Sequence, residues 1–179
     1  MKKKIHLFFP LLALCFLFFA PMCHAQTYGN KSSVGLNLLY DIQLRDGFGA
    51  NIGSNIGVAA FAEIPVTFSW SLRVFANVYG LVIKTDYDRC AMGGAGILLN
   101  VNNAIRGELC RGNLYVMLGA GASYMVEDMD GIGMAAIAGV GYSYWLTKTV
   151  NLHAESTFSM LGVSKIYSGI IGIGCSFML

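Results

Sequence analysis

The sequence predicts an all-β fold: an eight-stranded, antiparallel, up-and-down transmembrane β-barrel that follows a cleaved signal peptide. Three observations lead to this prediction. The N-terminus has the features of an export signal, and the rest of the chain is more apolar than an ordinary water-soluble domain. Its apolar residues also alternate with small or polar ones, which is the two-residue period of a β-strand.

Residues 1–25 form the predicted signal peptide. Three lysines precede an apolar run over Leu7–Met22, and a small-residue cleavage pattern ends at Ala25. A membrane anchor is the alternative, but this run is shorter than the about 20 residues that span a bilayer, and it contains Pro10. We therefore interpret residues 26–179 as one exported barrel domain.

The composition favours a membrane barrel. The chain is 55% hydrophobic and 12% charged, with a mean hydropathy of +0.58, whereas soluble domains are about 25% charged. Beyond residue 25, however, no apolar run approaches the length of a spanning helix, and 22 glycines disfavour long helices. Backbone groups in lipid are satisfied only in helices or closed barrels, so we expect a barrel with an apolar outer face.

The charge excludes one class of function. The formal net charge of +2 includes the three lysines of the signal peptide, so the remaining chain is near −1. No basic patch points to nucleic acid, and we expect no nucleic-acid partner.

The first three predicted strands alternate clearly. In the first, Leu36 and Leu38 share one face and Asn37 the other. The second ends near Pro65, where a missing backbone donor is tolerated, and the third places Arg73 on its inner face. The predicted ranges are about 33–41, 55–66 and 71–79, with loops at 43–54 and 80–88.

The fourth strand, about 89–101, is apolar on both faces. We place Asn100 inward, which turns Ile97 outward. A polar connection over 102–112 leads to the fifth strand, 113–124, and an acidic loop over 125–131 follows it.

A hairpin joins the sixth and seventh strands, which lie within 135–158. Inward residues are odd-numbered on both strands, so a turn centred at Lys148 fits the pattern. This register pairs Ser143 with His153 and Gly141 with Glu155 inside the barrel. A loop over 160–168 and an eighth strand over 169–177 complete the domain.

The strand lengths and their even number are typical of bacterial barrels. Aromatic residues near strand ends are expected to form two interfacial girdles: Tyr40, Trp70, Tyr79, Tyr124, Tyr142, Tyr144 and Phe177. A soluble, lipocalin-like periplasmic barrel for a small ligand is the alternative, and its apolar face would point inward. Charges on the predicted inner face favour the membrane version, because lipid-facing charges are poorly tolerated.

These segments resemble a known family. NIGVAAFAEIPVT, LRVFANVY, YVMLGAGASY, GVGYSYWLTKTVNLHAES and the final IIGIGCSF occur in an order similar to that of small outer-membrane β-barrel proteins of the OmpX/OmpA-like, porin-family type, particularly those of Bacteroidetes. The resemblance implies this fold and a location in the outer membrane of a Gram-negative bacterium. We expect outer-membrane lipid and the barrel-assembly machinery as partners, a monomer, and no cofactor. The resemblance fixes no reaction. Family members usually end on an aromatic residue, whereas Met178-Leu179 follow Phe177 here.

The inward polar residues are the candidate site. Glu63 and Arg73 flank a turn centred near Phe68, so we expect a buried ion pair across neighbouring strands. Glu155 and His153 can extend this pair into a structural network. Asn77 is also assigned to the interior polar network. We expect a structural or surface-interaction role through the short external loops, without catalysis. A narrow solute channel lined by the inward polar residues is the alternative, although eight-stranded barrels are normally filled by side chains.

Catalytic and metal sites are not expected. His153 and Glu155 point inward while Ser156 points to lipid, so one strand does not supply a catalytic set. The acidic loop lacks the ligand spacing of an EF-hand. Beyond the signal peptide the cysteines are Cys90, Cys110 and Cys175, for which we expect no structural disulfide.

Overall fold

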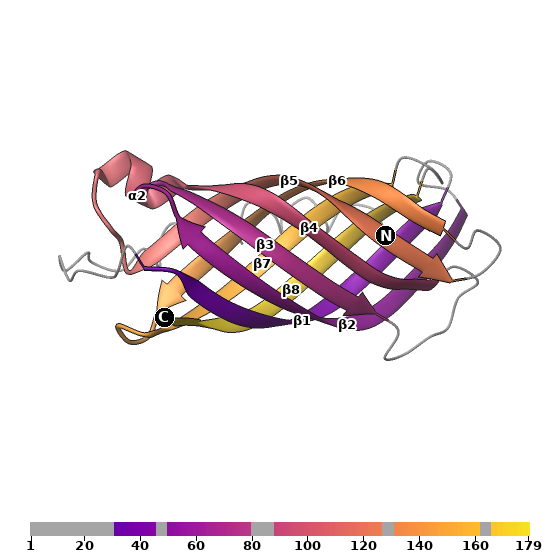
Figure 1. The fold of residues 1–179 in the computed structure, drawn as a ribbon, viewed down its shortest axis with the longest axis horizontal. Helices are drawn as coiled ribbons and strands as arrows, with labels where there is room; N and C mark the ends of the chain where they lie inside the picture. The colour runs from indigo at the N-terminus through magenta and orange to yellow at the C-terminus, as the bar shows by residue number, and fades with distance from the viewer. Residues whose placement is uncertain (1–30, 46–49, 80–87, 127–130, 162–165) are drawn as a thin grey trace, which may run out of the picture.

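Eight antiparallel strands close into a barrel in the computed structural model, which describes residues 31–45, 50–79, 88–126, 131–161 and 166–179. Each strand pairs with its neighbours in the sequence, and the last pairs with the first (Figure 1). The all-β, up-and-down barrel predicted from the sequence is confirmed; the predicted signal peptide lies outside the described residues. The strands are β1 (Ser33–Arg45), β2 (Ala50–Pro65), β3 (Trp70–Tyr79), β4 (Asp88–Asn100), β5 (Gly112–Val126), β6 (Gly131–Trp145), β7 (Val150–Leu161) and β8 (Ile166–Met178).

The strands are longer at one end than the sequence predicts. The segment 43–54 was expected to be a loop, but β1 continues to Arg45 and β2 begins at Ala50. The ladder runs through Gln43 opposite Gly53, so neighbouring strands hold this glycine-rich segment extended against its local preference. The expected loops at 80–88, 125–131 and 160–168 are shortened in the same way, and their central residues lie outside the described ranges.

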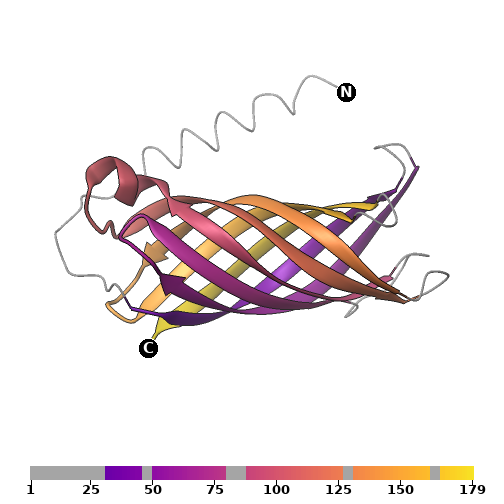
Figure 2. The same cartoon turned by 45° about the horizontal axis from the view of Figure 1, so that its top comes forward.

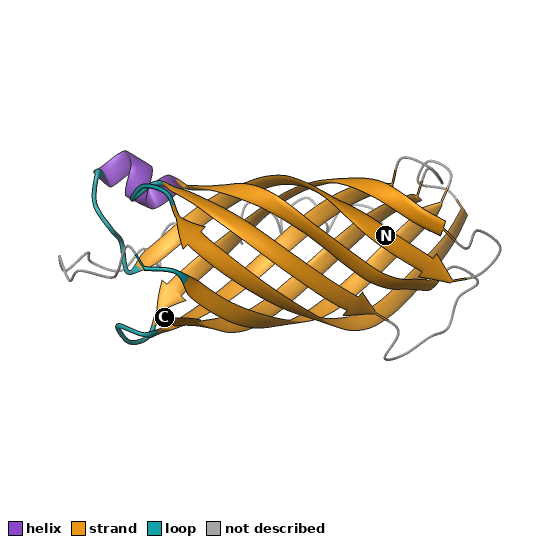
Figure 3. Ribbon diagram, in the orientation of Figure 1, coloured by secondary structure: helices purple, strands orange, loops and turns teal. Residues whose placement is uncertain are grey.

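The structure also contains a short helix that the sequence did not predict. The connection predicted over 102–112 contains α2 (Val101–Arg106), which Figure 3 shows at one end of the barrel. The helix stops at Gly107, whose φ of 70° lies in the left-handed region that glycine adopts without strain. The Gly107 N–H donates to the carbonyl oxygen of Asn103 at 2.8 Å and completes the cap.

The two faces of the barrel wall differ in polarity as predicted. Leu36 is 64% exposed on the outer face, while the next residue, Asn37, is 4% exposed on the inner face. Strand β4, which is apolar on both faces, follows the predicted phase, with Ile97 50% exposed and Leu98 1% exposed. Apolar side chains therefore point outward, which excludes the lipocalin-like arrangement. Among the described residues, none of the helices has the length and apolar character of a membrane span.

The prediction that Tyr79 belongs to an aromatic girdle is wrong. Tyr40, Trp70, Tyr124 and Phe177 are exposed on the outer face, but Tyr79 is buried inside the barrel. It shares the inward parity of Arg73 on β3, so its position follows from the pleat of the strand.

The register of the β6–β7 hairpin is confirmed. Ser143 lies opposite His153 and Gly141 opposite Glu155, as a turn centred at Lys148 requires. The hydroxyl oxygen of Thr147 accepts hydrogen bonds from the backbone N–H groups of Thr149 and Val150, at 3.2 and 3.0 Å, and tightens the turn.

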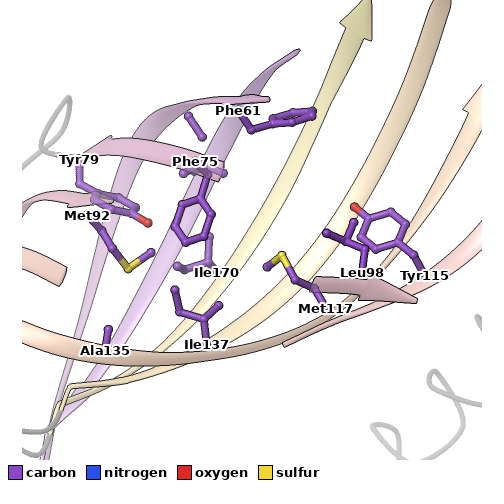
Figure 4. Packing of buried hydrophobic residues seen from close by; sticks show 12 residues of the cluster. Phe61, Phe75, Tyr79, Met92, Leu98, Tyr115, Met117, Ala135, Ile137 and Ile170 are labelled. Atoms are coloured by element: carbon purple, nitrogen blue, oxygen red, sulfur yellow. The ribbon is translucent and has the colours of Figure 1, made fainter. Parts of the chain in front are cut away.

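Glycines make room for the aromatic side chains inside the barrel. Four inward aromatic residues lie opposite a glycine on a neighbouring strand, and a Cβ atom on any of these glycines would come closer than 3.0 Å to the ring. Figure 4 shows how the rings and aliphatic side chains fill the interior. The pairs are Phe61 with Gly35, Phe75 with Gly94, Tyr79 with Gly57 and Tyr115 with Gly141.

The two ends of the barrel are distinguishable. The tight turns after β2 and β6, the helix α2 and the ends Ser33 and Met178 lie together at one end, as the turned view in Figure 2 also shows. Bacterial barrels keep short turns on the periplasmic side, so we call this end the periplasmic end and the opposite one the outer end.

The glycine at position 141 offers a test of this packing. Gly141→Ala is expected to destabilise the barrel by about 1–3 kcal/mol, because the new methyl group meets the Tyr115 ring. Gly169→Ala is the matched control, since a Cβ atom there has open space around it. Urea unfolding, followed by the shift of the folded band on a gel of unheated samples, measures both. Equal losses for the two variants would contradict the packing.

Candidate functional site

An ion-paired cluster crosses the interior toward the periplasmic end. Arg73 on β3 is 4% exposed, and its two terminal nitrogens bind different carboxylates. Nη2 donates to Glu63 Oε2 at 3.0 Å, and Nη1 donates to Glu155 Oε2 at 2.7 Å. Glu63 is the direct cross-strand partner of Arg73, and the structure contains the ion pair that the turn centre predicted. Glu155 reaches the same guanidinium from β7, on another part of the wall.

Further donors hold the Glu155 carboxylate. The Asn37 amide donates to Oε1 at 2.9 Å, and the Tyr115 hydroxyl donates to Oε2 at 2.8 Å. Gly141 lies between Tyr115 and Glu155 in the ladder, and the missing side chain leaves the path between them open. Both oxygens of this partly buried acid are therefore satisfied, which offsets the cost of removing the charge from water.

Aromatic rings enclose the guanidinium. The Cζ atom of Arg73 lies 4.5 Å from the ring centre of Phe61 and 5.1 Å from that of Tyr115, within the range of cation–π contacts. His153 meets the Phe61 ring edge-on at 5.0 Å between centres. Its Nε2 atom contacts the Asn37 carbonyl oxygen, so Nε2 carries the donated proton while the Asn37 amide group serves Glu155.

Small spaces lie on both sides of the cluster. A cavity of about 70 Å³ on the periplasmic side is lined by Glu63, Arg73 and His153 among others. A second, of about 30 Å³, lies on the other side, and its lining includes Arg73, Glu155 and Asn77. Each is large enough for water, and Arg73 borders both. The guanidinium and its partners thus form a partition across the barrel.

Asn77 takes a different place from the other predicted residues. It is buried on the inner face of β3, and its amide donates to the Tyr79 hydroxyl at 3.0 Å, farther toward the outer end. Glu63, Arg73, His153 and Glu155 come together in one cluster, while Asn77 borders the smaller cavity beside it.

Sequence reasoning did not assign Asn37, Phe61 and Tyr115 to the cluster. Their inward parity was visible, but the contacts cross between strands that lie far apart in the sequence. The small inward residues, Gly141 above all, were the available indication, because they mark where a large side chain can cross the wall.

The arrangement lacks the parts of a hydrolytic or metal centre. His153 and Glu155 are inside the barrel, whereas Ser156 is exposed on the outer face, as expected from its parity. Across the part of the chain that the structure describes, no three His, Cys, Asp or Glu side chains are grouped so as to hold a metal ion.

Comparison with known proteins supports the fold. No protein-family model and no curated protein matches the chain. Among solved structures it is similar to Neisserial surface protein A, with a TM-score of 0.62 and 14% identity over 83% of this chain and 97% of that one. The fold is that of a small outer-membrane β-barrel.

Two more barrels support this conclusion. The attachment invasion locus protein Ail of Yersinia pestis has a TM-score of 0.55 and 15% identity over 83% of this chain and 98% of that one. The outer membrane protein OprG of Pseudomonas aeruginosa has a TM-score of 0.57 and 11% identity over 85% and 98%. The apolar outer face suits this barrel to a lipid bilayer. The likeness to Bacteroidetes proteins stays a prediction.

The central arginine is expected to be essential for stability. Arg73→Ala leaves Glu63 and Glu155 without their common partner, and this should cost about 3–5 kcal/mol in the free energy of unfolding. Lys148→Ala, in the exposed β6–β7 turn, should change it by less than about 0.5 kcal/mol. Urea titration of the refolded protein in lipid vesicles measures both variants.

A neutral replacement separates pairing from packing. Arg73→Met combined with Glu63→Gln and Glu155→Gln should recover part of the loss, since no unpaired charge is then buried. A triple variant as unstable as Arg73→Ala would show that the charges are not the cause.

Proposed function

We propose that this protein is a sealed, monomeric outer-membrane barrel with a structural or surface-interaction role, acting through the segments at its outer end and neither catalysing a reaction nor passing solute. The surrounding outer-membrane lipid is its permanent partner. The barrel-assembly machinery remains a predicted partner during biogenesis.

The partition around Arg73 carries the proposal. The guanidinium is bound on two sides by carboxylates and enclosed by two aromatic rings, and the spaces beside it are only about 70 and 30 Å³. Eight strands give an interior that side chains can fill, and here they do so with a bonded layer. Such an interior favours a supporting wall over a pore.

The names of similar proteins support a role at the cell surface. One is a surface protein and another is the product of an attachment invasion locus. In a barrel of this kind, the segments between strands at the outer end are free to vary while the wall keeps its fold. Here those segments centre on residues 46–49, 80–87, 127–130 and 162–165, which lie outside the described residues.

A narrow channel is the second candidate. The cavities on both sides of Arg73 favour it, because displacement of one side chain would bring them together. Opening would require breaking contacts from Arg73 to two carboxylates, which are charge-assisted hydrogen bonds and roughly twice as strong as neutral ones. We therefore favour the sealed barrel.

A two-part experiment tests the proposal. In planar lipid bilayers the refolded protein should show no channel steps above the background of the lipid, while a large porin in the same bilayer provides the positive control. On intact cells, replacement of the outer segments by short Gly-Ser turns, one segment at a time, should weaken the attachment of producing cells to immobilised matrix proteins or polysaccharides for at least one of the four.

The controls make both parts decisive. Each loop variant must retain the gel shift of a folded barrel, and a Lys148→Ala variant at the periplasmic end should attach like the parent. Regular conductance steps would favour the channel. Unchanged attachment after replacement of each outer segment in turn would contradict the surface role.

A further inference from the structure

We propose that α2 is an interfacial anchor that lies in the phospholipid headgroup layer at the periplasmic face of the membrane. The helix contributes one residue to a group of exposed apolar side chains that we call the rim patch. This patch consists of Val66, Phe68, Trp70 and Ile105, all exposed apolar side chains at the periplasmic end.

Asparagine side chains fix the rotation of α2. The amide of Asn103 donates to the carbonyl oxygen of Phe68 at 2.8 Å, and its own carbonyl oxygen accepts the N–H of Cys110 at 2.8 Å. The side-chain oxygen of Asn113 accepts the N–H groups of Asn102 and Asn103, at 3.1 and 3.3 Å. Asn103 is buried by these contacts, so its face of the helix is turned toward the barrel mouth.

The opposite face carries Ile105. Successive residues of a helix are about 100° apart, so Ile105 lies about 200° from Asn103 and about 40° from Val101. Ile105 is 79% exposed, although the hydrogen bonds of Asn103 hold the helix against the barrel. A rigid, outward-facing apolar residue indicates a surface that another phase or molecule covers.

The rim patch continues the membrane-facing belt of the barrel. Trp70 pairs with Leu99, the last outward residue of β4, and the Asn100 N–H donates to Ser69 O at 2.8 Å next to Phe68. In Figure 1, α2 stands at the rim of the barrel wall directly beyond β4. Phe68 and Trp70 therefore continue the belt at the rim, and α2 begins directly after β4, next to them.

The depth of α2 matches the headgroup layer. A tilted strand advances about 2.5 Å per residue along the membrane normal, so Val101 lies about 5 Å beyond Leu99. The interfacial layer on each side of the hydrocarbon core is about 5–8 Å thick. The helix thus begins inside this layer, where an exposed tryptophan such as Trp70 is also expected.

The charge at this end fits lipid phosphate. Among the exposed side chains described at the periplasmic rim, Lys31, Arg106 and Lys148 are cationic and Glu108 is anionic. Arg106 follows Ile105 directly, so an inserted isoleucine brings the guanidinium to the level of the phosphates. Apolar and basic residues side by side are typical of helices that lie in a membrane surface.

Tryptophan fluorescence tests the position of Ile105. Ile105→Trp is introduced in a Trp70→Phe, Trp145→Phe background, and the full-length barrel is refolded into vesicles of phosphatidylcholine and phosphatidylglycerol. Lipids brominated close to the glycerol end of their acyl chains should quench the emission of this residue, because bromine quenches only tryptophan within contact range.

Ala104→Trp in the same background is the matched control. It adds the same indole to the neighbouring exposed position, which is turned by about 100°, so we expect quenching at position 105 to be about twofold stronger. Equal quenching at both positions would show that the helix has no inserted face. Unquenched, water-like emission at position 105 would contradict the proposal that α2 lies in the headgroup layer. A periplasmic protein would then be the partner that covers the rim patch.

The phosphate contact has its own test. Arg106→Gln in the Ile105→Trp background should weaken the quenching in vesicles that contain phosphatidylglycerol and have little effect in phosphatidylcholine alone. An effect of the same size in both lipids would contradict a role for the guanidinium in binding the anionic headgroup. Retention of the gel shift in all variants ensures that folded barrels are compared.

Discussion

The contact of Arg73 with Glu63 and Glu155 constrains the rest of the interior, because a charge so deeply buried must be bonded on several sides. Glu155 lies within reach only if the wall between β5 and β7 carries small residues, and Gly141 meets that condition. Tyr115 then crosses the open position and bonds the same carboxylate. The distribution of glycines and the position of the ion-paired layer are thus two aspects of one packing solution.

The same contact ties the interior to the register of the strands. A slip of one residue would turn Arg73 toward lipid and the apolar belt toward the lumen. Glu63 meets Arg73 only because the β2–β3 turn is centred at Phe68. The lipid outside and the ion pairs inside therefore favour the same strand register. The ion pairs make this register specific, although their contribution to net stability is modest.

The alternation of inward and outward residues along the strands was enough to predict most of the fold from the sequence. It predicted the outer belt, the facing of β4 and the β6–β7 pairing, because these depend on the two-residue period alone. The bonds from Glu155 to Asn37 and Tyr115 depend on how distant strands close around the barrel, which no local pattern contains. Strand ends were also underestimated, since neighbouring strands hold glycine-rich segments extended beyond their own preference.

At the periplasmic end, too, the local sequence pattern did not predict the structure. A polar connection was expected after β4, and its composition gave no reason to expect a helix. The helix forms because Asn103 and Asn113 bond its backbone and the barrel mouth at once.

The most direct test of the ion-paired layer around Arg73 is a double-mutant cycle on Arg73→Met and Glu155→Gln, with free energies of unfolding measured in vesicles. We predict that the double variant loses less than the sum of the two single losses by about 1–3 kcal/mol; additivity within about 0.5 kcal/mol would contradict a bonded layer at the centre of the barrel.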